Sequence, residues 1–141
     1  FARQGRPDAA VEEIERCLDV DPTYVAALWN LAVLERGAED GVGAVFERLA
    51  RALAVDPTSA QLRMLRGDLL LDSQRFGEAE AAYRSVLEVA PRSADAWANL
   101  ARALVALGKR REAQDAAGAA LAIDPSHAAA RELRRDLDAR P

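Results

Sequence analysis

The sequence predicts an all-α protein built as a stack of antiparallel helix hairpins, and three observations support this prediction. Four segments end with the pattern Leu-x-(Val/Ile)-(Asp/Ala)-Pro, at Pro22, Pro57, Pro91 and Pro125. The spacings between successive prolines are nearly constant: 57−22 = 35, 91−57 = 34 and 125−91 = 34. Between them, apolar residues recur at the period of an α-helix. A single hairpin of this size cannot bury both of its apolar faces, so each needs neighbours of its own kind.

The segment Ala94–His127 gives the clearest repeat. Its first helix has apolar residues at i, i+3, i+4 and i+7, and its second helix carries mostly alanines at i, i+4, i+7 and i+8. These two sets are Trp97, Leu100, Ala101 and Leu104, followed by Ala113, Ala117, Ala120 and Leu121. Alanines allow two helices to approach closely, and we expect Trp97 to be buried between them.

This pattern resembles the tetratricopeptide repeat (TPR) family, whose repeat of about 34 residues has characteristic places for Trp, Leu, Gly, Tyr, Ala, Phe and Pro. The third repeat fills those places with Trp97, Leu100, Ala101, Leu104, Ala113, Ala117 and Pro125. The second repeat fills them with Gly67, Leu70, Ala79, Tyr83 and Pro91. The first does so with Leu28, Leu31, Ala32, Leu49 and Pro57, with one residue inserted between its helices. The resemblance implies a right-handed α-solenoid of about eight helices.

We therefore expect one solenoid over residues 1–141. It would comprise a partial repeat (1–24), full repeats at 25–59, 60–93 and 94–127, and a C-terminal capping helix (128–141). Gly5 matches Gly108 by its distance from the closing proline, so we expect a turn at Gly5 and the first complete helix over Asp8–Val20. An apolar stripe left bare there, including Ala10 and Ile14, would favour self-association.

The remaining helices are predicted from their stop and start residues. Ser126 is the expected cap of the last helix, Thr58 or Ser59 caps the one that ends at Leu71, and 36–41 is the longest connection. The predicted helices are Tyr24–Glu35, Val42–Val55, 59–71, Phe76–Val89, Ser93–Leu107, Arg110–Ile123 and Ala128–Ala139.

The second repeat departs from the pattern, because Arg63 and Arg66 occupy the places of Trp97 and Leu100. Either their aliphatic stems pack while their charged ends reach water, or the helix rotates to bury Leu62, Leu65 and Leu69. We favour the packed stems.

Composition narrows the possible functions. The net charge of −4 and a pI near 5.1 disfavour nucleic-acid binding, which needs a basic surface. No apolar run approaches the ~20 residues of a membrane-spanning helix, so we expect a soluble segment, with the compartment left open. The Ala/Arg-rich, Lys-poor usage suggests a bacterial source. The single cysteine, Cys17, replaces small packing residues of the other repeats, and its expected role is structural.

Nothing in the sequence indicates catalysis, a metal or a cofactor. His127 is the only histidine and Lys109 the only lysine, so neither a histidine metal cluster nor a phosphate-binding lysine loop can be assembled. His127 falls in a turn between repeats, where we expect a structural role. We predict a chain that is not an enzyme.

In the family, the first helix of each repeat lines a concave wall that faces the ligand. The lining places lie four, seven, eleven and fourteen residues after each proline. The binding residues this implies are Trp29, Val33, Arg36, Met64, Asp68, Leu71, Asp95 and Arg102, beside Ala26, Gln61, Ala98 and Val105. An apolar stripe flanked by charges favours a peptide with apolar anchors, and Trp29 is the expected main anchor.

One family specialisation is a clamp of Lys, Asn and Arg that holds the C-terminal carboxylates of heat-shock chaperones. Asn30 and Asn99 occupy the central Asn place. The basic and amide places around Asn99 hold Met64, Asp68, Ala129 and Leu133, and those after Asn30 hold Gln61 and Leu65. The clamp is therefore not expected here.

The sequence favours a non-catalytic module that binds a protein or peptide. One alternative is a regulatory or substrate-recruiting segment of a larger enzyme. The sequence before Phe1 would distinguish this alternative from an independent interaction module. Another is an RNA-reading repeat of similar period, which the acidic balance disfavours and titration with single-stranded RNA would decide.

Overall fold

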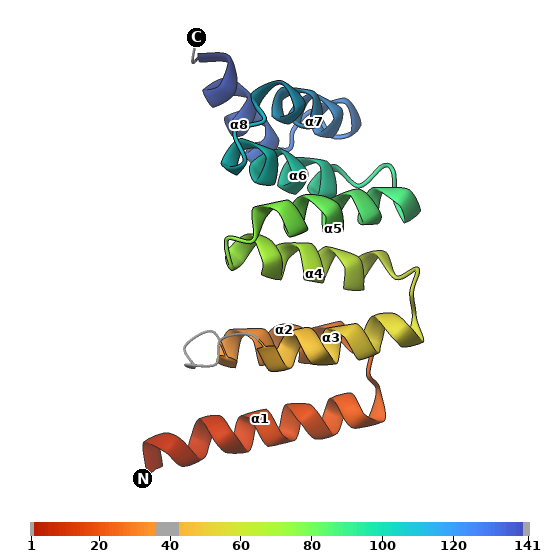
Figure 1. Ribbon diagram of the computed structural model, residues 1–141, viewed down its shortest axis with the longest axis vertical. Helices are drawn as coiled ribbons and strands as arrows, with labels where there is room; N and C mark the ends of the chain where they lie inside the picture. The colour runs from red at the N-terminus through yellow and green to blue at the C-terminus, as the bar shows by residue number, and fades with distance from the viewer. Residues whose placement is uncertain (1, 36–42, 140–141) are drawn as a thin grey trace. The chain divides into compact units, whose positions relative to one another are not determined.

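The computed structural model describes residues 2–35 and 43–139, which form eight α-helices and no strand (Figure 1). The predicted connection at 36–41, Val42 and the predicted site residue Arg36 lie outside these residues. The chain divides into two compact units, 1–65 and 66–141, with the division inside one helix. The prediction of an all-α protein of about eight helices is confirmed.

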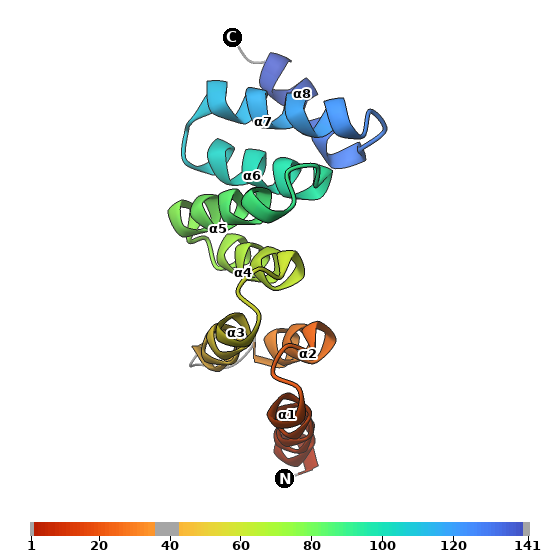
Figure 2. The same ribbon diagram turned by 90° about the vertical axis from the view of Figure 1, so that its right-hand side faces the viewer.

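The N-terminal unit contains α1 (Ala2–Val20), α2 (Val25–Glu35), α3 (Gly43–Val55) and the beginning of α4 (Ala60–Asp72). Helix α2 contacts both α1 and α3, and Figure 2 shows α2 and α3 side by side. The buried residues of these helices are aliphatic: Leu18, Ala27, Leu28, Leu31, Ala32, Val45, Leu49, Ala52, Leu62 and Leu65.

The turn predicted at Gly5 is wrong, because α1 is continuous from Ala2. Gly108, the glycine that Gly5 matches, ends its helix by taking the left-handed conformation with φ +76°. Gly5 stays helical, because extending an existing helix is easier than ending it and nucleating another. Ala10, Ile14 and Cys17 are half-buried on α1, and self-association through this helix remains a prediction.

The C-terminal unit contains the rest of α4, α5 (Phe76–Val89), α6 (Ala94–Ala106), α7 (Arg110–Ile123) and α8 (Ala128–Ala139). Helix α6 packs against α5 and α7, and α8 contacts both α6 and α7 (Figure 1). The two hairpin turns are equivalent, because Gln74 (φ 61°) takes the left-handed conformation one repeat before Gly108. After each of these residues a backbone N–H returns to the helix, from Arg75 to Leu70 and from Lys109 to Leu104, both at 2.9 Å.

Helix starts repeat in the same way. Two residues after Pro57 and Pro91, the hydroxyls of Ser59 and Ser93 accept hydrogen bonds from the N–H groups of Leu62 and Ala96. At the third such place Nδ1 of His127 accepts from the N–H of Ala130 (3.2 Å).

The prediction that Ser126 caps α8 is therefore wrong. Its hydroxyl donates instead to Oδ1 of Asp124 at 2.8 Å and is engaged in the turn.

The departure in the second repeat has a local explanation. The guanidinium of Arg63 donates to the carbonyl of Pro57 through Nε (2.9 Å) and Nη2 (2.7 Å). Six residues after its own proline, the indole Nε1 of Trp97 donates to the carbonyl of Pro91 (3.1 Å). Arg63 therefore makes the same kind of hydrogen bond as Trp97, to the carbonyl of the preceding proline. It is half-buried, whereas Arg66 is exposed. Leu62, Leu65 and Leu69 are buried as well, so the two explanations offered by the sequence both hold in part.

Candidate functional site

Helix α2 carries the most apolar part of the predicted binding surface. Trp29 and Val33 lie four residues apart, one helical turn, and are 44% and 51% exposed. Ala26, three residues before Trp29, is exposed too. Neighbouring side chains in the helix, Leu28, Leu31 and Ala32, face the core. The sequence therefore predicts correctly that Trp29 is exposed and that its neighbour Leu28 is buried.

On α4, the predicted residues differ in their accessibility. Gln61 is exposed, whereas Met64, Asp68 and Leu71 are half-buried. Met64 belongs to the N-terminal unit, and Asp68 and Leu71 belong to the C-terminal unit. Each of the three keeps some exposed surface.

On α6 the prediction for Ala98 is wrong. Its side chain is only 1% exposed and packs in a cluster with Ala120 and Ala130, against which Trp97 and Leu121 rest. The approach of α8, which brings in Ala130, covers this position. Asp95, Arg102 and Val105, on the same helix, are exposed as predicted.

Asp68 is the centre of a polar network in the C-terminal unit. Its Oδ1 accepts a hydrogen bond from the hydroxyl of Tyr83 (2.7 Å) and one from Nδ2 of Asn99 (3.2 Å). Burial raises the pKa of the Asp68 carboxyl above its usual value, although the bond from Tyr83 and the charge of Arg102 act in the opposite direction. Burial also raises the pKa of the Tyr83 hydroxyl, and the neighbouring carboxylate of Asp68 adds to this.

Asp95 forms a second polar contact, with Nε2 of His127 at 2.7 Å. Because Nδ1 of His127 accepts a backbone N–H, the ring hydrogen lies on Nε2 and is donated to Asp95. The sequence places Asp95 on the predicted wall and His127 in a turn, but it does not pair them. The only signal is the repeat register, in which His127 occupies the capping place of Ser59 and Ser93.

No group of three or more His, Cys, Asp or Glu side chains among residues 2–35 and 43–139 could hold a metal ion. In the same part of the chain, no helix is long and apolar enough to cross a membrane.

Comparisons with known proteins support the same architecture. Family models described as tetratricopeptide repeat match residues 1–60 and 70–137. The human protein O-mannosyl-transferase TMTC3 is 30% identical over 109 residues, which are 77% of this chain and 12% of TMTC3. This chain thus spans only a small part of that relative's length.

Two solved structures show the fold. MamA from Desulfovibrio magneticus RS-1 superposes with a TM-score of 0.76 at 17% identity, covering 99% of this chain and 78% of MamA. The second TPR domain of human RPAP3, solved in complex with the HSP70 peptide SGPTIEEVD, gives a TM-score of 0.64 at 22% identity, covering 79% and 98%. With the repeat register and the family models in agreement, the chain belongs to the tetratricopeptide repeat family.

Proposed function

We propose that this chain is a non-catalytic protein-interaction module that binds a peptide or partner segment through exposed residues of α2, α4 and α6. The observation that supports this most directly is the exposed apolar pair Trp29 and Val33 on α2. Large exposed apolar side chains that lie together commonly mark interaction sites. The RPAP3 domain, which shares the fold, was solved with a bound peptide.

The proposed roles follow from exposure and charge. Trp29 is the main anchor, because a large aromatic side chain that becomes desolvated contributes most of the energy in many interfaces. Val33, Met64 and Leu71 would add apolar contacts. Arg36, Asp68, Asp95 and Arg102 would orient the ligand through polar contacts.

The polar residues are unequal in this role. Asp68 already accepts hydrogen bonds from Tyr83 and Asn99, so much of its capacity is used inside the protein. Arg102 is exposed, and its charge acts on Asp68, but within the described part of the chain it forms no hydrogen bond or ion pair. Arg102 is therefore the better candidate to contact a ligand directly.

The ligand differs in chemistry from the acidic peptide in the RPAP3 complex. Met64, Asp68, Ala129 and Leu133 stand where the carboxylate clamp would need basic and amide side chains. Asp68 and Asp95 would repel an acidic peptide end. We therefore propose a ligand anchored by apolar side chains.

A peptide-display library panned against the chain tests this proposal. Peptides that bind should carry apolar anchors, and calorimetry should show that Trp29→Ala weakens them by about 2 kcal/mol or more. Val55→Ala is the matched control, because Val55 is also exposed (64%) but lies on α3, outside the proposed surface. Equal affinities for the two variants would show that the binding surface lies elsewhere.

A second candidate is that this segment recruits substrates for a larger enzyme. The observation that favours it is the match to 12% of an O-mannosyl-transferase. The coding sequence on both sides of the segment would show whether a catalytic domain accompanies it. If one does, Trp29→Ala should raise KM for a protein substrate and leave kcat unchanged, since it removes binding without touching the chemistry.

A further inference from the structure

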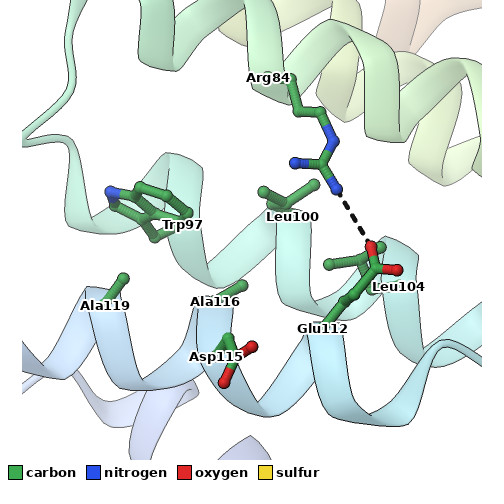
Figure 3. Close-up of a pocket in the computed structure, with 8 residues that line it drawn as sticks. All are labelled: Arg84, Trp97, Leu100, Leu104, Glu112, Asp115, Ala116 and Ala119. Carbon is green, nitrogen blue, oxygen red and sulfur yellow. Dashed lines mark hydrogen bonds and ion pairs between the residues drawn. The ribbon is translucent and has the colours of Figure 1, made fainter.

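A pocket of about 260 Å³ lies within the C-terminal unit, among α5, α6 and α7 (Figure 3). None of its lining residues belongs to the surface proposed above. They are Arg84 from α5, Trp97, Leu100 and Leu104 from α6, and Glu112, Asp115, Ala116 and Ala119 from α7. The pocket is therefore a separate candidate site.

The apolar wall of the pocket is well fixed. Leu100 and Leu104 are almost completely buried, and the hydrogen bond from its indole to the carbonyl of Pro91 holds Trp97 in place. Ala116 and Ala119 leave open space where longer side chains would cover this wall (Figure 3). Part of the Trp97 ring thus remains accessible from the pocket.

The charges of the side chains that line the pocket do not cancel. Arg84 is shared between Glu80 (3.1 Å) and Glu112 (3.3 Å), as Figure 3 shows for Glu112. Asp115 is exposed, and among the described residues it has no hydrogen bond or ion pair. Arg84, Glu112 and Asp115 together carry a charge of 1 − 2 = −1. The pocket therefore combines an aromatic ring, an apolar wall and an unpaired carboxylate.

We propose that this pocket binds an arginine side chain presented by a partner protein. The aliphatic stem would contact Leu100 and Ala116, the guanidinium would lie against the Trp97 ring, and its N–H groups would reach the carboxylate of Asp115. Arginine suits the site better than lysine, because its planar group stacks on aromatic rings and binds carboxylates in a bidentate way. The volume is below the ~300–1,000 Å³ of pockets for small-molecule ligands, and so fits one side chain.

The test uses N-acetyl-arginine amide as the probe and N-acetyl-citrulline amide as its uncharged isostere. NMR would follow the indole N–H signals of the two tryptophans, assigned with Trp29→Phe. The arginine probe should shift the Trp97 signal in a saturable way and leave the Trp29 signal unchanged. Citrulline should bind about two- to fivefold more weakly, the usual contribution of an accessible ion pair.

Two variants and one control separate the contribution of the Asp115 carboxylate from that of the open space in the pocket. Asp115→Asn should weaken the arginine probe by the same factor as citrulline, whereas Asp136→Asn, which removes an exposed carboxylate on α8, should have no effect. Ala119→Leu should abolish the shift by filling the pocket, with thermal melting to confirm folding. The proposal is wrong if arginine causes no saturable shift at Trp97, if citrulline binds equally well, or if both Asp115→Asn and Ala119→Leu bind like the unmodified chain. Because the probe bypasses α2, these results are independent of the proposed peptide surface.

Discussion

A β-carbon on Gly67 would stand 2.6 Å from Cε1 of Tyr83, closer than real β-carbons in proteins come to a non-bonded atom. The ring of Tyr83 is completely buried and its hydroxyl is held by Asp68. In the third repeat the same two places hold Ala101 and Ala117, and in the first they hold Ala32 and Leu49. The side chains at these two places share one limited space between the helices of a hairpin. Position 67 is a glycine because residue 83 is a tyrosine.

Gly67→Ala should therefore destabilise the protein by about 1–3 kcal/mol, the usual cost of overpacking. The intrinsic helix propensity alone would favour alanine by about 1 kcal/mol, so the steric effect decides the sign. Urea unfolding measures the change. In a Tyr83→Ala background the same substitution should become neutral or stabilising. An equal loss in both backgrounds would show that the two residues are not coupled.

Asp68→Asn should stabilise the protein at neutral pH. Because burial raises the folded-state pKa of Asp68 above its usual value of 3.8, the ionised carboxylate costs stability at neutral pH. That cost disappears as the pH falls and the folded protein takes up the proton. The difference in melting temperature between Asp68→Asn and the unmodified chain should therefore be largest at pH 7 and shrink toward pH 4.

A control separates charge from hydrogen bonding at this position. Asp68→Ala removes the acceptor of Tyr83 and Asn99 and should cost about 1–3 kcal/mol. If the advantage of Asp68→Asn were instead constant between pH 4 and pH 7, the buried charge would not be its cause.

His127→Ala should loosen the start of α8. It removes the acceptor for the N–H of Ala130, and loss of such a cap costs about 0.5–2 kcal/mol. His127→Ser restores the residue type that caps α4 and α6, and should recover most of the loss without restoring the contact to Asp95. Amide hydrogen exchange over 128–139 provides the measurement. Equal protection in the alanine and serine variants would show that the cap contributes nothing to α8.

Sequence periodicity is sufficient to predict much of the fold. The bounds of α5, α7 and α8 are as predicted, and a proline or a left-handed residue marks the turns before and after α5 and α7 and the turn before α8. Gly5 does not end a helix, although the repeat register matches it to Gly108. The repeat register also predicts which face of a helix lies on the proposed binding surface, but it does not predict which neighbouring element covers that face.

Features that depend on individual side chains could not be predicted from the repeat period. Ala98 is buried because α8 brings Ala130 against it, and the pair of Asp95 and His127 depends on a capping role that histidine seldom takes. The pocket beside Trp97 results from two alanines, Ala116 and Ala119, that the pattern does not distinguish from ordinary packing residues. Each of these features depends on side-chain size or rotation across helices, which the repeat period leaves open.

The two tryptophans should respond differently to truncation. Trp97 packs against Ala98, Ala120 and Ala130 but is only half-buried, less than the sequence predicts. Trp97→Ala should therefore cost less than the ~3–5 kcal/mol of a fully buried aromatic side chain and still clearly lower the melting temperature. Trp29 is 44% exposed, so Trp29→Ala should change the free energy of unfolding by less than about 1 kcal/mol.

Trp97→Phe separates the two contributions of the indole. It keeps most of the ring contact and removes the hydrogen bond to Pro91, and should cost about 0.5–1.5 kcal/mol. Urea unfolding of the three variants side by side makes the comparison. If Trp29→Ala unfolds the protein as readily as Trp97→Ala, then Trp29 supports the fold and cannot be the free anchor of a binding surface. If Trp97→Ala leaves the unfolding midpoint unchanged, then the packing of α6 against α7 does not depend on the indole, because Leu100 and Leu104 alone are enough to hold the two helices together.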